Sequence, residues 1–301
     1  MAMNRKFLLV GMAAGAIVIT AVGRHFVPAP AGPAPRAGAP ARIVSLSPSL
    51  TETLFALGLA DRVAGVTRFC AHIPGAKGKP TVGGFLDLNL ESVMNLRPDL
   101  VVTLPWHREV KDRLAGMGLA TLEVNHDSVA GIRASLVALG KACGVEGRTR
   151  EILADLDRRA AALAARTAGR SRPRVLVTTG RPVGTGTLQD ICIAGRGSVF
   201  DDLITLAGGD NAWGDRKLPY PTLSAEGVLT LAPEVIMDLV PDLEKNRWSA
   251  AMILREWSVL PDLPAVKTGR IHVFGEPWAL APGPRYVELA EKMADVIHPR
   301  K

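Results

Sequence analysis

Apolar residues recur at intervals of three and four positions between Glu146 and Thr167, with charged residues between them. This spacing predicts an amphipathic helix with one apolar stripe and one charged face. Asp155 and Arg159 lie one helical turn apart on the charged face, where such a pair adds a few tenths of a kcal/mol. The helix should be about 30 Å long and stop before Gly169. Its apolar stripe comprises Ile152, Leu153, Leu156, Ala160, Leu163 and Ala164.

A short motif occurs once on each side of this helix. Both copies hold a glutamate, a valine, a leucine, a proline and an acid in the same register, from Glu91 to Asp99 and from Glu226 to Glu234. A motif found once per half predicts two similar lobes joined by a rigid helix. We therefore expect an amino-terminal lobe, a connecting helix and a carboxyl-terminal lobe, at residues 42–145, 146–168 and 169–301.

Short aliphatic and β-branched runs alternate with helical segments in both halves. This order predicts a parallel α/β layer in each lobe. Ser49 and Glu52 have the spacing of a capping box, so we expect a helix from there to Gly58. The expected strands are Arg42–Leu46, Arg62–Thr67, Val101–Leu104, Thr121–Val124, Arg174–Thr178, Val235–Leu239 and Ile271–Phe274, and further helices are expected around Glu109–Met117, Val199–Leu206 and Arg285–Ile297.

Aromatic and polar residues gather where these strands end. In an open parallel sheet the ligand site lies beyond the carboxyl ends of the strands. Aromatic rings with scattered polar groups at such loops suit a cleft for a large, flat, partly apolar ligand. The positions are Ser47-Pro48-Ser49, Arg68-Phe69-Cys70, Trp106-His107, His126-Asp127, Arg181-Pro182, Pro219-Tyr220-Pro221 and Glu276-Pro277-Trp278.

The amino terminus predicts export. Arg5 and Lys6 precede an apolar run, so residues 1–23 read as a signal peptide, with an uncleaved membrane anchor as the alternative. Residues 24–41 form a linker rich in proline and alanine. The net charge of +7 comes without a basic run interleaved with aromatic residues, which argues against nucleic-acid binding.

Three cysteines lie far apart in the sequence and form no CxxC motif. They are Cys70, Cys143 and Cys192, so at least one thiol stays free if the others pair. Cys143 stands in a helical context rich in alanine and leucine, which predicts burial. Pairing of Cys70 with Cys192 is left open by the sequence.

Several segments in order resemble one known family. They are RIVSLSPSLTETLFALG, GVTRFC, LNLESVMNLRPDLVV, LAGGDNAW and LSAEGVLTLAPEVI. Together they resemble the periplasmic substrate-binding proteins of ABC importers for cobalamin, siderophores and haem, and most closely the cobalamin-binding branch. The resemblance extends from Arg42 to the carboxyl terminus. It implies two α/β lobes bridged by one long helix, and a monomer that captures a corrinoid without chemistry or cofactor and delivers it to a membrane permease dimer.

The resemblance also implies roles for individual residues. Phe85 and Tyr220 stand where the cobalamin binders have tryptophan, and the disulfide expected in the second lobe has no evident counterpart, because only Cys192 lies in that half. Glu91 and Glu226 match the two glutamates that dock onto arginines of the permease. With Trp106 added from its strand-end position, the expected ligand-binding residues are Ser47, Pro48, Ser49, Phe69, Phe85, Trp106, Tyr220, Trp278 and Arg285.

Three other functions compete with a corrinoid carrier. A metal-dependent enzyme or a zinc carrier would draw on His72, His107, His126 and Asp127, but the chain has no HExxH, GxSxG or phosphate-binding glycine motif and no histidine-rich loop. We therefore expect no metal site. A haem or ferric-siderophore carrier of the same transporter class is the closer alternative, since Tyr220 or His107 could supply an axial ligand to haem iron.

Overall fold

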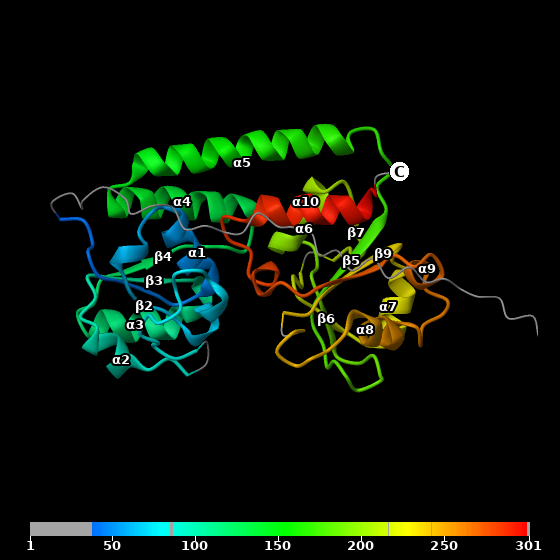
Figure 1. Cartoon of the computed structure of the whole chain (residues 1–301), viewed down its shortest axis with the longest axis horizontal. Coiled ribbons are helices and arrows are strands. Elements are labelled where there is room, and N and C mark those ends of the chain that lie inside the picture. Colours follow the sequence, from blue (N-terminus) through cyan, green and yellow to red (C-terminus); the bar gives the residue numbers. More distant parts are fainter. Residues whose placement is uncertain (1–37, 85–86, 216, 242, 300–301) are drawn as a thin grey trace, which may run out of the picture.

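The amino-terminal lobe is built on a four-stranded parallel sheet in the order β2-β1-β3-β4 (Figure 1). The computed structural model describes residues 38–84, 87–215, 217–241 and 243–299, so the predicted signal segment and most of the linker lie outside the described residues. The strands are β1 (Ile43–Ser45), β2 (Val63–Gly65), β3 (Leu100–Thr103) and β4 (Thr121–Glu123). The helices are α1 (Pro48–Ala56), α2 (Leu90–Asn95), α3 (Arg108–Gly116) and α4 (Val129–Cys143), with 3-10 turns η1 (Ala60–Arg62), η2 (Arg68–His72) and η3 (Pro105–His107).

The carboxyl-terminal lobe has a six-stranded mixed sheet in the order β10-β9-β5-β6-β8, with β7 paired to β5. The strands are β5 (Arg174–Gly180), β6 (Ile191–Ile193), β7 (Asp210–Asn211), β8 (Thr222–Leu223), β9 (Val235–Leu239) and β10 (Ile271–Phe274). The helices are α6 (Val199–Leu206), α7 (Ala225–Leu231), α8 (Ala250–Trp257), α9 (Pro264–Lys267), α10 (Tyr286–Ile297) and the 3-10 turn η4 (Pro277–Ala279).

The prediction of a parallel layer is wrong for one edge of this second sheet. Strand β6 is antiparallel to both β5 and β8. An antiparallel neighbour needs only a loop, whereas a parallel one needs a crossover of a dozen or more residues. Positive φ angles at Gly184 and Gly186 (84° and 73°) let the chain turn back between β5 and β6. This antiparallel edge places the loop before β8 on the side of the lobe that faces the amino-terminal lobe.

The long helix α5 (Glu146–Thr167) runs along both lobes and covers α4 and α10 (Figure 1). Its bounds are those of the predicted helical period. Leu156 and Leu163 are buried, and they belong to one core cluster that also contains Ile43 of β1 and Val175 of β5. Two α/β lobes bridged by this helix therefore share a continuous core. Ala164, predicted in the apolar stripe, is exposed.

Ion pairs connect α5 to α10 and also form within α5, where Arg148 pairs with Glu151 and Arg158 pairs with Asp155. Nη2 of Arg159 lies 2.7 Å from Glu291 of α10, while the predicted partner Asp155 is 3.9 Å from Nη1. Further along, Arg166 pairs with Asp295 of α10 at 2.9 Å. Glu291 is a better partner for Arg159 than Asp155, because its two carboxylate oxygens accept two parallel N–H bonds from the guanidinium.

The first helix starts two residues before its predicted capping box. Ser47 is the N-cap of α1, its hydroxyl bonds the Ser49 hydroxyl at 3.1 Å and caps no backbone amide, and Pro48 fills the first helical position. Glu52 is 2% exposed, so its side chain does not return to the start of the helix. The predicted end is right, since Gly58 has a φ of 78° just after α1.

Glu52 instead lies beside the segment of residues 280–285, which connects η4 to α10 and passes between the lobes; we call it the crossing segment. Arg285 forms two hydrogen bonds with Glu288, at 3.0 and 2.9 Å, and its Nη1 lies 3.7 Å from Glu52. Burial raises the pKa of Glu52 to about 7, although Arg285 opposes the shift. The crossing chain also passes very close to α1, because a Cβ on Gly283 would lie 3.1 Å from the Ser49 carbonyl oxygen.

Replacing Glu52 by glutamine should stabilise the protein at pH 8 relative to the wild type and change it little at pH 5. The folded pKa of Glu52, about 7, is above its unfolded value. Its contribution to stability is therefore present at low pH and is lost as the pH rises through 7. At about 1.4 kcal/mol per unit, the difference between the two proteins should grow by about 2 kcal/mol from pH 5 to pH 8.

Urea unfolding at both pH values measures this difference, with Glu109→Gln on the exposed side of α3 as the control. A gap between Glu52→Gln and the wild type that stays constant with pH would contradict the raised pKa.

Candidate ligand-binding site

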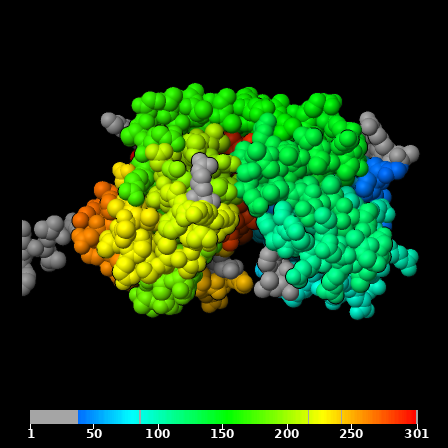
Figure 2. All heavy atoms as spheres, turned by 180° about the vertical axis from the view of Figure 1, so that it is seen from behind, coloured from blue at the N-terminus to red at the C-terminus, as the bar shows by residue number. Residues whose placement is uncertain are grey.

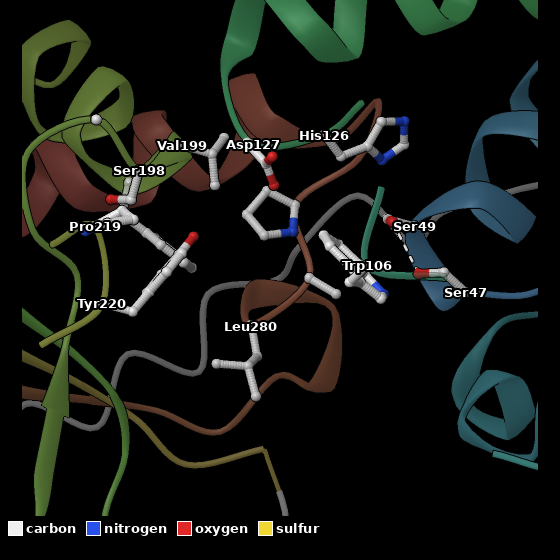
Figure 3. A pocket seen from close by; sticks show the side chains of 14 residues that line it. Ser47, Ser49, Trp106, His126, Asp127, Ser198, Val199, Pro219, Tyr220 and Leu280 are labelled. Carbon is white, nitrogen blue, oxygen red and sulfur yellow. Dashed lines mark hydrogen bonds between the residues drawn. The ribbon is translucent and has the colours of Figure 1, made fainter. Parts of the chain in front are cut away.

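A cavity of about 580 Å³ opens between the two lobes. Figure 2 shows the hollow between the green-cyan face of the amino-terminal lobe and the yellow face of the other lobe, and Figure 3 shows its side chains. Its volume lies within the range of small-molecule sites. It is lined by Ser47, Ser49, Trp106, His126, Asp127, Gly197, Ser198, Val199, Phe200, Pro219, Tyr220, Leu280, Ala281 and Pro282.

Three parts of the fold supply this wall. In the amino-terminal lobe the carboxyl ends of β1, β3 and β4 carry the serines, Trp106 and the pair His126-Asp127. Parallel strands bring these ends to one edge, as the alternation of elements predicts. The carboxyl-terminal lobe adds the start of α6 and the loop before β8, and residues 280–282 of the crossing segment lie between the lobes (Figure 3).

Some predicted ligand-binding residues lie in this wall and others do not. Ser47, Ser49, Trp106 and Tyr220 line the cavity. Phe85 lies outside the described residues. The remaining predicted residues, which are absent from the lining, are Pro48, Phe69, Trp278 and Arg285.

Trp278 and Arg285 interact with each other beside the cavity. The guanidinium carbon of Arg285 lies 3.9 Å from the centre of the Trp278 ring, which is 9% exposed. Phe69 is 51% exposed on η2, with the Arg68 guanidinium 5.2 Å from its ring centre. A role in ligand binding for these residues stays a prediction. To contact a ligand in the cavity, their side chains would need a different rotamer or the lobes a different relative position.

Arg181, noted at a strand end in the sequence, is not in the cavity. Its side chain is 1% exposed and pairs with Asp238 at 2.8 Å and with Glu256 at 2.6 Å. The Trp257 indole also donates to Asp238, at 2.8 Å. Two carboxylates pair with one guanidinium here, so the arginine is held within the lobe and is unavailable to a ligand.

Tyr220 stands on the carboxyl-terminal wall and Asp127 on the opposite side. The phenol is 44% exposed, and loss of water around it in the cleft raises the pKa of Tyr220 to about 12. The Asp127 carboxylate adds to this increase, and a hydrogen bond with Ser198 opposes it. Tyr220 therefore stays protonated at neutral pH and can donate a hydrogen bond to a ligand.

His126 is a buried, uncharged part of the wall. It is 5% exposed, and neither ring nitrogen has a hydrogen-bond partner among the described residues. Burial lowers the pKa of His126 to about 4, so the ring is neutral at pH 7. In Figure 3 the ring points toward the amino-terminal lobe, away from Tyr220.

Sequence reasoning missed the start of α6 and the crossing segment. Residues 197–200 and 280–282 line the cavity without an aromatic-proline signature at a strand end. A usable signal was present, because Ser198 precedes α6 as an N-cap and its hydroxyl accepts from the Asp201 amide at 3.4 Å. The glycine and proline run before Arg285 likewise marked an irregular segment between two elements.

The other histidines considered for metal or haem do not meet in the cavity. His107 is buried, and its Nδ1 accepts a hydrogen bond from the Leu104 amide at 3.1 Å. His72 bonds the Phe69 carbonyl at 3.0 Å. Across residues 38–84, 87–215, 217–241 and 243–299, no group of three or more histidines, cysteines and acids is spaced to hold a metal ion.

The cysteines are all unpaired. Cys70 and Cys143 are buried and Cys192 is partly buried, and each has a free thiol. Burial of Cys143 agrees with its predicted helical context, and burial raises the pKa of its thiol to about 11. The question of a Cys70–Cys192 disulfide is answered in the negative for this structure. The described segments also contain no helix that is both long and apolar enough to span a membrane.

The two repeated motifs adopt the same backbone form. Glu91 and Glu226 lie in the first turns of α2 and α7, after N-caps Asn89 and Ser224 whose side chains accept from backbone amides. Each helix is then ended by a left-handed residue directly before proline, namely Arg97 and Ala232, with φ of 45° and 46°. The repeat therefore encodes a capped helix and its stop, with one glutamate displayed in each lobe.

Comparisons with known proteins agree with this architecture. A family model described as periplasmic binding protein matches residues 43–277. A cobalamin-binding protein of Halobacterium salinarum is 28% identical over 86% of this chain and 70% of its own, and a vitamin B12-binding protein of Salmonella choleraesuis is 25% identical over 85% and 90%. The solved structure of the periplasmic heme-binding protein BhuT with two hemes has a TM-score of 0.73 at 26% identity, covering 86% of this chain and 98% of that one.

Replacing His126 by leucine should reduce the acid sensitivity of the fold. Its folded pKa of about 4 is below its unfolded value, so the wild type loses stability as the pH falls below about 6.5. At about 1.4 kcal/mol per unit, this loss amounts to about 2 kcal/mol between pH 7 and pH 5, and the variant should lack it. Thermal unfolding at both pH values measures the loss, and an equal loss in both proteins would contradict a buried neutral imidazole.

Proposed function

The chain belongs to the periplasmic binding protein family, and on that premise we propose that it is the substrate-binding component of an ABC importer. In this proposal it captures a corrinoid between its two lobes and delivers it to a permease dimer. The relatives are named as binding proteins, and the proposed action is capture and release without chemistry.

One observation carries the proposal: the cavity lies between the lobes and both lobes line it. A ligand there touches the ends of β1, β3 and β4 and also the start of α6. Trp106 and Tyr220 offer aromatic faces that are 48% and 44% exposed. Exposed rings on opposite lobes suit a broad, partly apolar ligand, because its contacts then stabilise one relative position of the lobes.

Haem is the second candidate ligand. The specific observation in its favour is the Tyr220 phenol at the cavity wall, since tyrosine can ligate haem iron. A ferric siderophore remains a third candidate of the same transporter class. We favour the corrinoid because the sequence segments resemble the cobalamin-binding branch most closely; the share of this chain that is matched does not discriminate, since the heme-binding protein BhuT and the cobalamin-binding relatives cover it about equally.

Docking to the permease is the proposed role of Glu91 and Glu226. Both lie in first helical turns of matching motifs, one in each lobe. The helix dipole favours a carboxylate at such a position, which is the simpler account of each residue taken alone. Two equivalent anions on separate lobes would in addition fix the orientation of the protein on a two-fold permease bearing arginines.

The same proposal gives the protein its place in the cell. A periplasmic carrier must be exported, as the predicted signal segment at residues 1–23 would achieve, with an uncleaved anchor as the alternative. It would act as a monomer and meet the membrane through the permease.

Calorimetry with cyanocobalamin, haemin and a ferric siderophore tests the ligand. We expect cyanocobalamin to bind most tightly, and Trp106→Ala and Tyr220→Ala each to weaken it by about tenfold or more, because an aromatic contact is worth about 1 kcal/mol or more. Val259→Ala, which removes an exposed side chain outside the cavity, serves as the control. Tight binding of haemin alone would assign the protein to haem.

Alanine at Glu91 and Glu226 together should abolish most uptake in a reconstituted transporter. The ligand affinity should stay unchanged, because neither residue lines the cavity. Glu109→Ala, an exposed acid in the first turn of α3, is the matched control. Uptake equal to that of the wild type would reduce both glutamates to a role in helix stability.

A further inference from the structure

The cavity wall carries a net negative charge. Among the described residues that line it, Asp127 is the one side chain that is charged at neutral pH, since His126 is neutral. The other polar side chains in the lining are the hydroxyls of Ser47, Ser49, Ser198 and Tyr220. A ligand in this cavity therefore meets hydroxyl groups and one carboxylate, and no cation from the described part of the lining.

Arg181, Arg285 and Arg68 are already paired with acids of the protein, and Arg196, directly before the lining residue Gly197, is not part of the lining. Arg181 is held by Asp238 and Glu256 as described above. Arg285 is bonded by Glu288. Arg68, beside the exposed Phe69, forms two 2.6 Å hydrogen bonds with Asp87. These pairs cancel the positive charge that an anionic ligand would need.

The start of α6 does not offset this charge either. A helix amino terminus attracts anions through its free amides. Here Asp201 lies in the first turn, and its carboxylate accepts from the Gly197 amide at 3.3 Å. Asp202, beside it, accepts from the Val129 amide of α4 at 2.8 Å. Asp201 and Asp202 therefore place two carboxylates in the first turn, at the positive end of this helix, while the amides they accept from belong to Gly197 before the helix and to Val129 of α4.

Asp127 itself has no hydrogen-bond or ion-pair partner for its carboxylate in the described part of the chain. Its backbone is fixed, because its amide donates to the Asn125 side chain at 2.6 Å and Ser128 caps α4 through the Gly131 amide at 3.0 Å. In Figure 3 it lies in the upper wall, between Val199 on one side and His126 on the other. A fixed loop thus presents an unpaired acceptor to the ligand.

We propose that Asp127 selects ligands by charge: it accepts hydrogen bonds from neutral amide side chains and repels ligands that carry carboxylates. An ionised carboxylate is an acceptor only, and it can take several N–H donors. Corrinoids bear amides around the ring, whereas haem bears two propionates. Like charges brought together in a binding site repel each other. The inference rests on the proposed role as a corrinoid carrier and assigns its specificity to one residue.

The experiment compares cyanocobalamin and haemin on the full-length protein and on Asp127→Asn and Asp127→Lys, at low and at high salt. Asparagine keeps the shape and one acceptor but removes the charge. We expect it to weaken cyanocobalamin by roughly threefold to tenfold and to tighten haemin by about tenfold, with lysine tightening haemin further. The effect on haemin should diminish at high salt, since screening weakens charge repulsion. Asp112→Asn on the exposed side of α3 controls for the change in net charge.

Two results would overturn the inference. One leaves the proposed function as a corrinoid carrier intact, and the other overturns it as well. If the wild type binds cyanocobalamin and neither variant changes either affinity, the charge selection is wrong and the corrinoid carrier stands. If the wild type binds haemin more tightly than cyanocobalamin, the charge selection by Asp127 and the role as a corrinoid carrier are both wrong. Thermal unfolding of each variant shows whether it is folded, and Asp127→Asn, being isosteric in an exposed loop, keeps the test available if the lysine variant unfolds.

Discussion

The packing of α5 across both lobes is the constraint on which the rest of the structure depends. Leu156 and Leu163 lie in the same buried cluster as strand residues of each sheet. Fully burying a leucine contributes about 1.5–3 kcal/mol, whereas exposed ion pairs such as Arg166–Asp295 contribute about 1 kcal/mol or less. The apolar stripe therefore holds the lobes together, and the ion pairs select the register of α5 on α10.

Several half-buried arginines pair with acids, among them Arg159 and Arg166 of α5, Arg181 and Arg285. Arg181 meets two carboxylates and Arg285 meets Glu288, with Glu52 nearby. Such pairing is required wherever a guanidinium leaves water, because an unpaired buried charge costs several kcal/mol. One consequence reaches the ligand site, where Asp127 is left without a protein partner. The stability of the fold and the selectivity of its cavity thus depend on the same pairing of charges.

The repeated motif links sequence symmetry to an interaction surface. Left-handed φ angles at Arg97 and Ala232 are unfavourable for residues other than glycine, and both stand directly before proline. A strained stop that occurs twice fixes where each short helix ends and how its first turn is presented. Glu91 and Glu226 lie in those first turns. The matching geometry is a property of the chain itself, independent of any partner.

The sequence by itself determined the local elements and their order. The bounds of α5, α6, β9 and β10 coincide with the predicted ranges, because hydrophobic period and caps act between residues a few positions apart. The strand ends carrying Ser47, Ser49 and Trp106 followed from the same alternation. These features need no knowledge of distant residues.

Only the tertiary structure decided which surfaces meet. Arg159 prefers Glu291 over its neighbour Asp155, Glu52 is buried against the crossing segment instead of capping α1, and β6 pairs in antiparallel fashion. The cavity wall likewise includes residues 280–282, which lie between η4 and α10 of the carboxyl-terminal lobe. Each outcome depends on partners more than about ten residues away in sequence, whose choice is set by burial and charge compensation that no local pattern records.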